Sequence, residues 1–302
     1  MKKELFKYII LLILFSITVF PEVCSDGVAL GINLLTNSLI PAIFCFIIFS
    51  NFVILSGYST YLGRLFHPII HFLFNTSYNG SYAVVMGFLC GFPIGSKIVS
   101  DLENTSKISH EEASYLYNFI NHASPAFIQG YLVYSLLKIP YHRLTILFII
   151  YAPEIILGLI YRPKKAFVSP ITDKIELKYP FSKLIDDSVS SGLKSIIKIS
   201  FFVIIFSVIV CFINKCFFIP SVIKLFLISA CEMTSGLYFL MSYPLKKEII
   251  ILLSSYICIF GGISTIFQIK SIVSTNSFNI IQYIKNKLIA LLIATIFWFI
   301  IF

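Results

Sequence analysis

Long apolar runs separated by short polar links organise this chain. A helix needs about 20 apolar residues to cross the hydrocarbon core of a bilayer. Six runs approach or exceed that length, near residues 5–20, 29–56, 144–161, 196–214, 219–240 and 286–302. Together with a more polar segment at 113–137, these runs predict about seven full spans. The expected fold class is therefore an all-α, polytopic integral membrane protein.

Residues 81–97 are apolar but rich in residues that break helices. Relative to alanine, each glycine in a helix interior costs about 1 kcal/mol and a proline about 3 kcal/mol. At membrane depth, irregular backbone persists only where protein buries it or where it lines a water-filled cavity. The segment therefore predicts a re-entrant hairpin with Lys97 beside it, and the tip of this hairpin holds Gly91, Pro93, Gly95 and Ser96.

The segment 113–137 is a second interrupted element. Ser109 and Glu112 have the spacing of a capping box, which predicts a helix start just before this segment. Pro125 then interrupts the helix. Three polar candidates for contacts with a solute precede the proline in an otherwise apolar crossing: Asn118, Asn121 and Ser124.

Residues 249–269 form the third interrupted segment, with Gly261, Gly262 and Ser264 in its middle. We expect it to be broken or re-entrant. Interrupted segments at corresponding places in two halves point to a midplane binding site of a transporter. Residues 43–50 resemble residues 201–207, and residues 92–96 match residues 261–265. The distance between the two segments is similar in both cases. These features predict two related membrane halves, 1–161 and 196–302, joined by a basic linker, 162–195.

Composition supports a membrane protein, because 58% of the residues are hydrophobic and only 12% are charged. Soluble domains have about 25% charged residues. The net charge of +9 comes mostly from Lys and Arg in the links, without a basic stripe interleaved with aromatic residues. We therefore expect the lipid bilayer as surroundings and no nucleic-acid partner. Because Lys and Arg beside spans stay in the cytoplasm, the N-terminus, the linker, Lys246 and Lys247 are expected inside and the C-terminus outside.

The broken helices suggest a site for a small anionic compound. Helix ends at a break present a positive dipole, and Lys97 would add a cation. Glu154 and Glu232 are the carboxylates deepest in apolar surroundings, and Glu232 is the candidate for coupling or gating. The sequence has no recognisable nucleophile–base pair and no metal-ligand set, so we expect neither catalysis nor a metal or other cofactor. An intramembrane enzyme and a non-transporting scaffold are the alternatives.

The stretches IPAIFCFIIFSNFVI (40–54), GFLCGFPIGSK (87–97), NFINHASPAFIQG (118–130), EMTSG (232–236) and FGGISTIFQI (260–269) resemble the sporulation integral membrane proteins of endospore formers, which carry a nucleoside-recognition (Gate) domain. The resemblance covers most of the chain from about 30 to 285. It implies transport of dipicolinic acid from the mother cell toward the forespore, across the outer forespore membrane.

On this resemblance the motif residues belong to the substrate path, in particular Gly91, Pro93, Gly95, Lys97, Asn118, Asn121, Ser124, Glu232, Gly261 and Gly262. The wider Gate group includes transporters of nucleosides and of other small solutes, so such a transporter is the alternative within the resemblance. A scaffold in spore-envelope assembly is the alternative outside it. The sequence leaves open whether the chain forms a homo-oligomer.

Overall fold

The computed structural model describes residues 15–168 and 180–302. Within this part every regular element is a helix, which confirms the all-α class. Most of the expected first span, 5–20, and residues 169–179 of the expected linker lie outside the described residues. Four described helices are long and apolar enough to cross a membrane, and a bent pair would make a fifth. The protein is therefore a polytopic integral membrane protein.

The first half contains a long helix, several short ones and one straight span. In chain order its elements are α2 (Pro21–Leu34), η1 (Leu35–Leu39), α3 (Ile40–Leu55), α4 (Tyr58–Phe74), α5 (Tyr78–Cys90), α6 (Ile94–Asn104), α7 (His110–Leu116), α8 (Pro125–Phe127), η2 (Ile128–Leu137), η3 (Pro140–His142) and α9 (Arg143–Ile160). The second half comprises α10 (Phe181–Lys215), α11 (Ser221–Cys231), α12 (Met233–Leu240), α13 (Lys247–Phe260), α14 (Gly262–Ile272) and α15 (Ile280–Ile301).

A long helix opens each half. Elements α2, η1 and α3 continue one another with helical backbone at both junctions, and they match α10 in length. Gly27 and Gly31 let α2 approach α10 closely, because a Cβ on either would lie within 3 Å of the Cα of Val208 or Ile204. Residues 181–195, which we expected in a linker, form the first turns of α10.

Helices α5 and α6 form the hairpin predicted for residues 81–97. They pack against one another, and a Cβ on Gly95 would lie 3.1 Å from the Cα of Gly87. The tip is Gly91–Pro93, where Gly91 has a φ of 66° and the Phe92–Pro93 peptide bond is cis. The small residues at the crossing therefore let the two arms lie side by side.

Helices α11 and α12 form a second hairpin, where we expected a full span at 219–240. A Cβ on Gly236 would lie 2.6 Å from the Cα of Ser229 in the opposite arm. The turn between the arms is Glu232, whose φ of −145° and ψ of 126° are extended. The expected crossing is wrong because the helix reverses at a residue that the apolar pattern does not mark. Lys246 and Lys247 therefore follow on the side where α10 ends, and not on the inner side where they were expected.

Two further elements are helical segments with a break at mid-length, and one of them is a candidate span. Helices α13 and α14 together form one apolar stretch of 26 residues that qualifies as a span, broken at Gly261 and Gly262. The segment 249–269 is thus a broken span and not a hairpin. In the first half α7 and α8 are separated by irregular residues 117–124, as the polar segment predicted.

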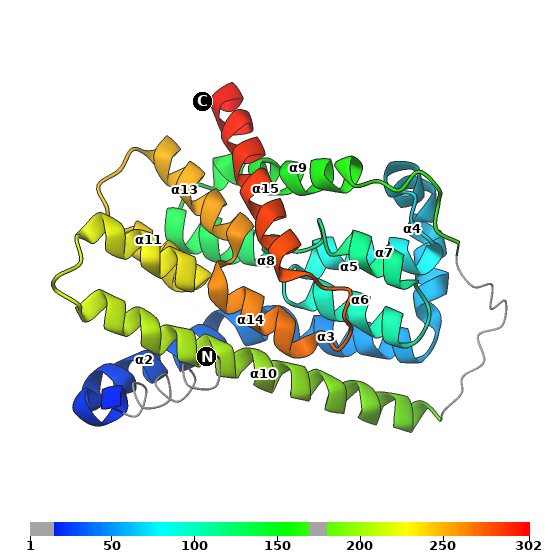
Figure 1. Cartoon of the computed structure of the whole chain (residues 1–302), viewed down its shortest axis with the longest axis horizontal. Helices are drawn as coiled ribbons and strands as arrows, with labels where there is room; N and C mark the ends of the chain where they lie inside the picture. The colour runs from blue at the N-terminus through cyan, green and yellow to red at the C-terminus, as the bar shows by residue number, and fades with distance from the viewer. Residues whose placement is uncertain (1–14, 169–179) are drawn as a thin grey trace, which may run out of the picture.

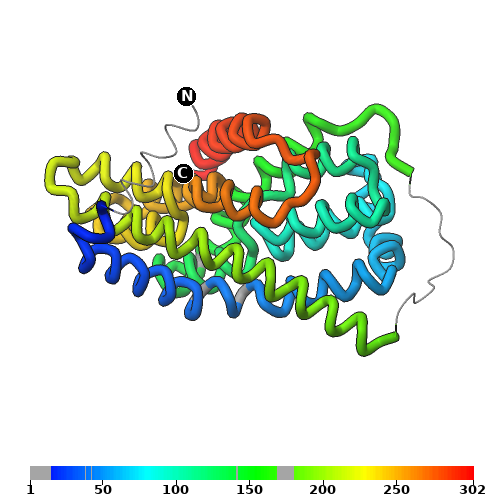
Figure 2. Tube along the Cα trace, turned by 60° about the horizontal axis from the view of Figure 1, so that its bottom comes forward, coloured from blue at the N-terminus to red at the C-terminus, as the bar shows by residue number. Residues whose placement is uncertain are grey.

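The two halves repeat one order of elements in opposite orientation. Each has a long helix, a hairpin, a broken span and a straight helix, and α4 is the extra element of the first half. The hairpin α5/α6 lies at the end of the molecule where α10 begins, and α11 lies at the opposite end (Figures 1 and 2). By this order the tip 91–93 corresponds to Glu232, so the expected match of 92–96 with 261–265 is wrong. The match of 43–50 with 201–207 agrees with the long helices.

Candidate functional site

The hairpin α5/α6 and the broken span α7–α8 cross at their breaks. The backbone N–H of Phe92 donates to the carbonyl of His122 at 2.8 Å. A Cβ on Gly91 would lie 2.4 Å from that carbonyl oxygen and 2.6 Å from the amide nitrogen of Ser124. Only glycine fits this position, because it must also adopt a positive φ. The unwound backbone is thereby buried in protein, as membrane depth requires.

The second half repeats this crossing between α11/α12 and α13/α14. A Cβ on Gly262 would lie 3.0 Å from the carbonyl oxygen of Cys231 and 3.2 Å from the amide nitrogen of Glu232. The two crossings also meet, since a Cβ on Gly261 would lie 2.9 Å from the ring of Phe92. All four breaks therefore converge on one region of the protein.

A small cavity lies where the breaks converge, and we call it the central cavity. Its volume is about 30 Å³, which holds no more than a few water molecules. The helices α6, α12 and α14, and the helix formed by α8 and η2, all begin at this region, so their positive dipole ends face one another. The cavity is lined by Leu39, Ile43, Cys90, Phe92, Pro93, Ala123, Ser124, Phe127, Glu232, Met233, Thr234, Thr265 and Gln268.

Glu232 is the charged residue of the central cavity and the cap of α12. Its side chain is 4% exposed. One carboxylate oxygen accepts from the amide of Thr234 at 3.0 Å and the other from the amide of Ser235 at 2.6 Å. The hydroxyls of Thr234 and Ser235 are buried and have no hydrogen-bond partner within the described part of the chain. They remain open to a ligand or to water.

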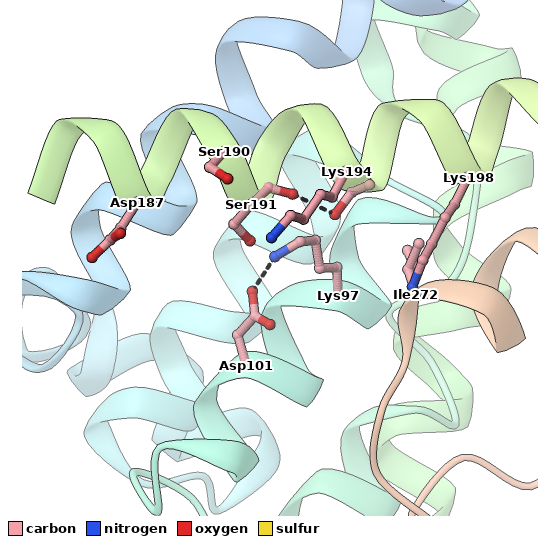
Figure 3. A pocket seen from close by; sticks show the side chains of 9 residues that line it. Lys97, Asp101, Asp187, Ser190, Ser191, Lys194, Lys198 and Ile272 are labelled. Carbon is pink, nitrogen blue, oxygen red and sulfur yellow. Dashed lines mark hydrogen bonds and ion pairs between the residues drawn. The ribbon is translucent and has the colours of Figure 1, made fainter.

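Two larger hollows flank the central cavity, and we name them after the expected orientation of the chain, in which α10 begins on the inner side. The inner hollow, of about 320 Å³, is lined by Lys97, Asp101, Asp187, Ser190, Ser191, Lys194, Ser195, Lys198 and Ile272 (Figure 3). The outer hollow, of about 440 Å³, is lined by Leu30, Asn33, Leu34, Asn37, Tyr131, Val210, Cys211, Asn214, Ser235, Tyr238 and Phe239. They lie at opposite ends of α10. Only about one helical turn of α6, from Pro93 to Lys97, separates the central cavity from the inner hollow.

We expected Lys97 to face the substrate site, but it does not line the central cavity. Its side chain is 4% exposed and forms an ion pair with Asp101 on the next turn of α6. It also donates to the amide oxygen of Asn51 at 2.7 Å. The partner at position i+4 neutralises the ammonium group and holds it in the floor of the inner hollow.

Asn118, Asn121 and Ser264 also take structural contacts away from the central cavity. Asn118 accepts from the side-chain amide of Asn286 at 2.8 Å. Asn121 accepts from the hydroxyl of Ser96, and Ser264 accepts from Gln268 at 3.0 Å. Of the expected site residues Pro93, Ser124 and Glu232 line the cavity, Gly91, Gly261 and Gly262 form the crossings, and Gly95 packs the hairpin. Sequence reasoning missed Thr265 and Gln268, although both lie in the motif that follows Gly261.

A buried ion pair supports the first crossing and was also missed. Lys287 on α15 binds Glu154 on α9 at 2.6 Å, with side-chain exposures of 2% and 0%. Lys287 also donates to the backbone carbonyl of Asn121 in the unwound segment. Lys287 was assigned no site role from the sequence, although a lysine beside an apolar run was the available signal.

The chain is similar to the sporulation integral membrane protein YlbJ of Bacillus subtilis (strain 168). The two are 24% identical over 208 residues, which covers 62% of this chain and 51% of the relative. The chain thus spans about half the length of that curated relative. No family model and no solved structure matches the chain.

Proposed function

We propose that this protein is a membrane transporter that moves a small solute by alternating access around the central cavity. The observation that carries the proposal is the convergence of two oppositely oriented hairpins and two broken spans on one cavity. Interrupted segments at corresponding places of inverted halves are characteristic of substrate sites in secondary transporters. The hollows on either side give each end of the path a mouth.

Dipicolinic acid is the proposed substrate, carried from the mother cell toward the forespore across the outer forespore membrane. The motif resemblance to Gate-domain sporulation proteins supports this assignment, and so does the similarity to a sporulation integral membrane protein. The inner hollow carries the basic residues, so a dicarboxylate would enter from the cytoplasmic side, with the C-terminus outside. The cavity of about 30 Å³ does not hold a pyridine ring. One hairpin must therefore move before the solute binds there.

Glu232 gives this transporter a coupling group. In a buried site, the carboxylate of Glu232 strongly repels a solute that carries two negative charges. A proton that travels with the solute removes this repulsion, so we propose that Glu232 carries a proton during transport. The helix N-termini around the cavity then stabilise the carboxylates of the solute.

A neutral solute such as a nucleoside is the second candidate. None of the described residues that line the central cavity is basic, and Thr234, Thr265 and Gln268 offer neutral hydrogen-bonding groups. Such a solute would bind without a proton on Glu232, and its flux would not increase when the pH falls.

Flux into proteoliposomes tests the proposal. Terbium ions trapped in the lumen become luminescent when pyridine-2,6-dicarboxylate reaches them and chelates them. We expect an inward proton gradient to speed the flux of the dicarboxylate through the wild-type protein, and Glu232→Gln, whose side chain is uncharged like a protonated glutamate, to keep a flux that no longer responds to the gradient. Glu248→Gln is the control, because Glu248 is exposed at the start of α13. A wild-type flux equal to that of empty liposomes would refute dicarboxylate transport, and labelled uridine then tests the second candidate.

A further inference from the structure

The inner hollow differs from the outer hollow in charge. Three lysines and two aspartates line the inner hollow, whereas the described residues of the outer hollow include no Lys, Arg, Asp or Glu. A hollow with low-dielectric walls and one sign of charge in excess concentrates counter-ions. Its volume of about 320 Å³ is in the range of small-molecule sites, which begins near 300 Å³.

The floor of the inner hollow is a buried ammonium group that already binds a carboxylate. Lys97 is 3% exposed, and a buried charge needs a partner. Asp101 supplies that partner from within the chain, while its own side chain is 29% exposed at the edge of the hollow. Asp101 therefore occupies the position that the carboxylate of a ligand would take.

A second ammonium group reaches the same place from another element. The side chain of Lys194 extends from α10 toward the Lys97–Asp101 pair (Figure 3). Among residues 15–168 and 180–302 the ammonium group of Lys194 has no hydrogen bond or ion pair. Lys198, one turn further, donates to the carbonyl of Ser271 at 3.0 Å. Of these two ammonium groups only Lys97 is paired with the Asp101 carboxylate, which leaves Lys194 available to a second anionic group.

We propose that the inner hollow is a docking site for a carboxylate of the transported anion, in which the ligand replaces Asp101 on Lys97 and is held in addition by Lys194. This inference rests on the proposed function for its ligand, but the binding it describes is measurable without transport. Since Pro93 immediately precedes α6 and Lys97 lies in the first turn of this helix, a ligand bound in the hollow is close to the central cavity. Loss of the Lys97–Asp101 pair would accompany its entry.

Titration calorimetry on the full chain in nanodiscs of zwitterionic lipid tests the proposal, with pyridine-2,6-dicarboxylate as the probe. Because an ion pair that stays open to solvent is weakened by screening, Lys194→Gln should weaken binding about fivefold. Asp101→Asn removes the competing carboxylate and should strengthen binding by a similar factor. Lys285→Gln is the matched control, because Lys285 is an exposed lysine on α15 outside the hollow. It should bind like the wild type.

Lys194 is exposed, so its replacement does not threaten the fold. Equal affinities in wild type, Lys194→Gln and Lys285→Gln would overturn the proposal. So would the absence of binding to the wild type, or equal binding of the uncharged diamide of the probe. If anionic lipid in the nanodisc abolishes the binding, the hollow is a lipid headgroup site and the proposal is wrong.

The flux assay keeps this inference separate from the proposed function. Binding that depends on Lys194 together with no flux would refute transport and keep the docking site. Flux through the wild type together with a Michaelis constant unchanged in Lys194→Gln would keep transport and overturn the docking site.

Discussion

The buried ion pair between Lys287 and Glu154 gives a sharp prediction about stability. Both side chains are at most 2% exposed, and the ammonium nitrogen lies 2.6 Å from one carboxylate oxygen. The other oxygen of Glu154 has no hydrogen-bond partner among the described residues. Lys287→Met therefore leaves a buried carboxylate without its counter-charge. Breaking a buried pair in this way costs about 3–5 kcal/mol.

Replacing both residues by apolar ones should restore most of that stability. The double variant Glu154→Leu/Lys287→Met removes both charges, and such replacements are often neutral or stabilising. It still loses the bond from Lys287 to the carbonyl of Asn121, worth about 1.5–3 kcal/mol for a charged donor. We therefore expect the double variant to recover about half of the loss. The double variant should therefore be more stable than Lys287→Met by about 2 kcal/mol.

Unfolding by denaturing detergent measures these differences. Trp298, the single tryptophan of the chain, lies on α15 with Lys287 and donates to the carbonyl of Glu248 at 2.9 Å, so its fluorescence reports on this helix. Lys285→Met is the control, because Lys285 is exposed two positions away. The reasoning fails if Lys287→Met is as stable as the control, or if the double variant is less stable than the single one.

Four further predictions follow from single features of the structure. Gly236→Ala should cost about 1–3 kcal/mol by separating the hairpin arms, whereas Gly130→Ala, whose Cβ would meet nothing within 4 Å, should be neutral in thermal unfolding. Burial raises the pKa of the Glu112 carboxyl, which precedes the span, to about 7. The folded state then binds a proton more tightly than the unfolded state, so stability should fall by up to about 3 kcal/mol as pH rises from about 4.5 to 7. In Glu112→Gln the unfolding midpoint should lose this pH dependence. Lys246→Cys should react with an impermeant maleimide from the outside of intact cells, above the labelling of the native cysteines, because the hairpin α11/α12 returns the chain to the side where α10 ends; labelling only after lysis would contradict the hairpin. Backbone amides of α11 and α12 should exchange with deuterium faster than those of α5 and α6, and equal rates would refute the difference in anchoring argued below.

The first hairpin could be predicted because its breakers are local. Gly91 and Pro93 each disfavour a helix through their own backbone chemistry, so the sequence alone places the tip. The capping box also predicted the start of α7 correctly, since Ser109 accepts from the amide of Glu112 at 3.1 Å. The Glu112 side chain, however, accepts from the amide of Ser77 in a distant segment at 2.7 Å. This contact joins two segments that are far apart in the sequence, so the spacing of Ser109 and Glu112 could not predict it.

The second hairpin could not be predicted in the same way. Residues 219–240 have no glycine or proline at the reversal, and the turn depends on Glu232 as a cap and on the approach of Gly262 from another element. Lys97 was misplaced for a related reason. Its motif indicated a cation near the tip, but the direction of the side chain is fixed by Asp101 and by Asn51 from α3. The i, i+4 spacing of Lys97 and Asp101 was the available signal.

The two hairpins differ in how firmly they are anchored. The hairpin α5/α6 is held by two hydrogen bonds: the hydroxyl of Ser96 donates to Asn121, and the backbone N–H of Phe92 donates to His122. The segment that accepts these bonds is itself held by Lys287 and Asn286 of α15.

In the hairpin α11/α12 the buried hydroxyls of Ser229, Thr234 and Ser235 have no hydrogen-bond partner among the described residues. A buried polar group without a partner costs about 1–3 kcal/mol. The packed position of α11/α12 is therefore less stable than the packed position of α5/α6. If α12 moves away from the central cavity, a solute or a water molecule can reach these hydroxyls and form hydrogen bonds with them. Such bonds would remove that cost. If the protein transports a solute as we propose, this asymmetry predicts that the hairpin α11/α12 makes the larger motion and that α5/α6, which carries Lys97, stays fixed on the side that receives the solute.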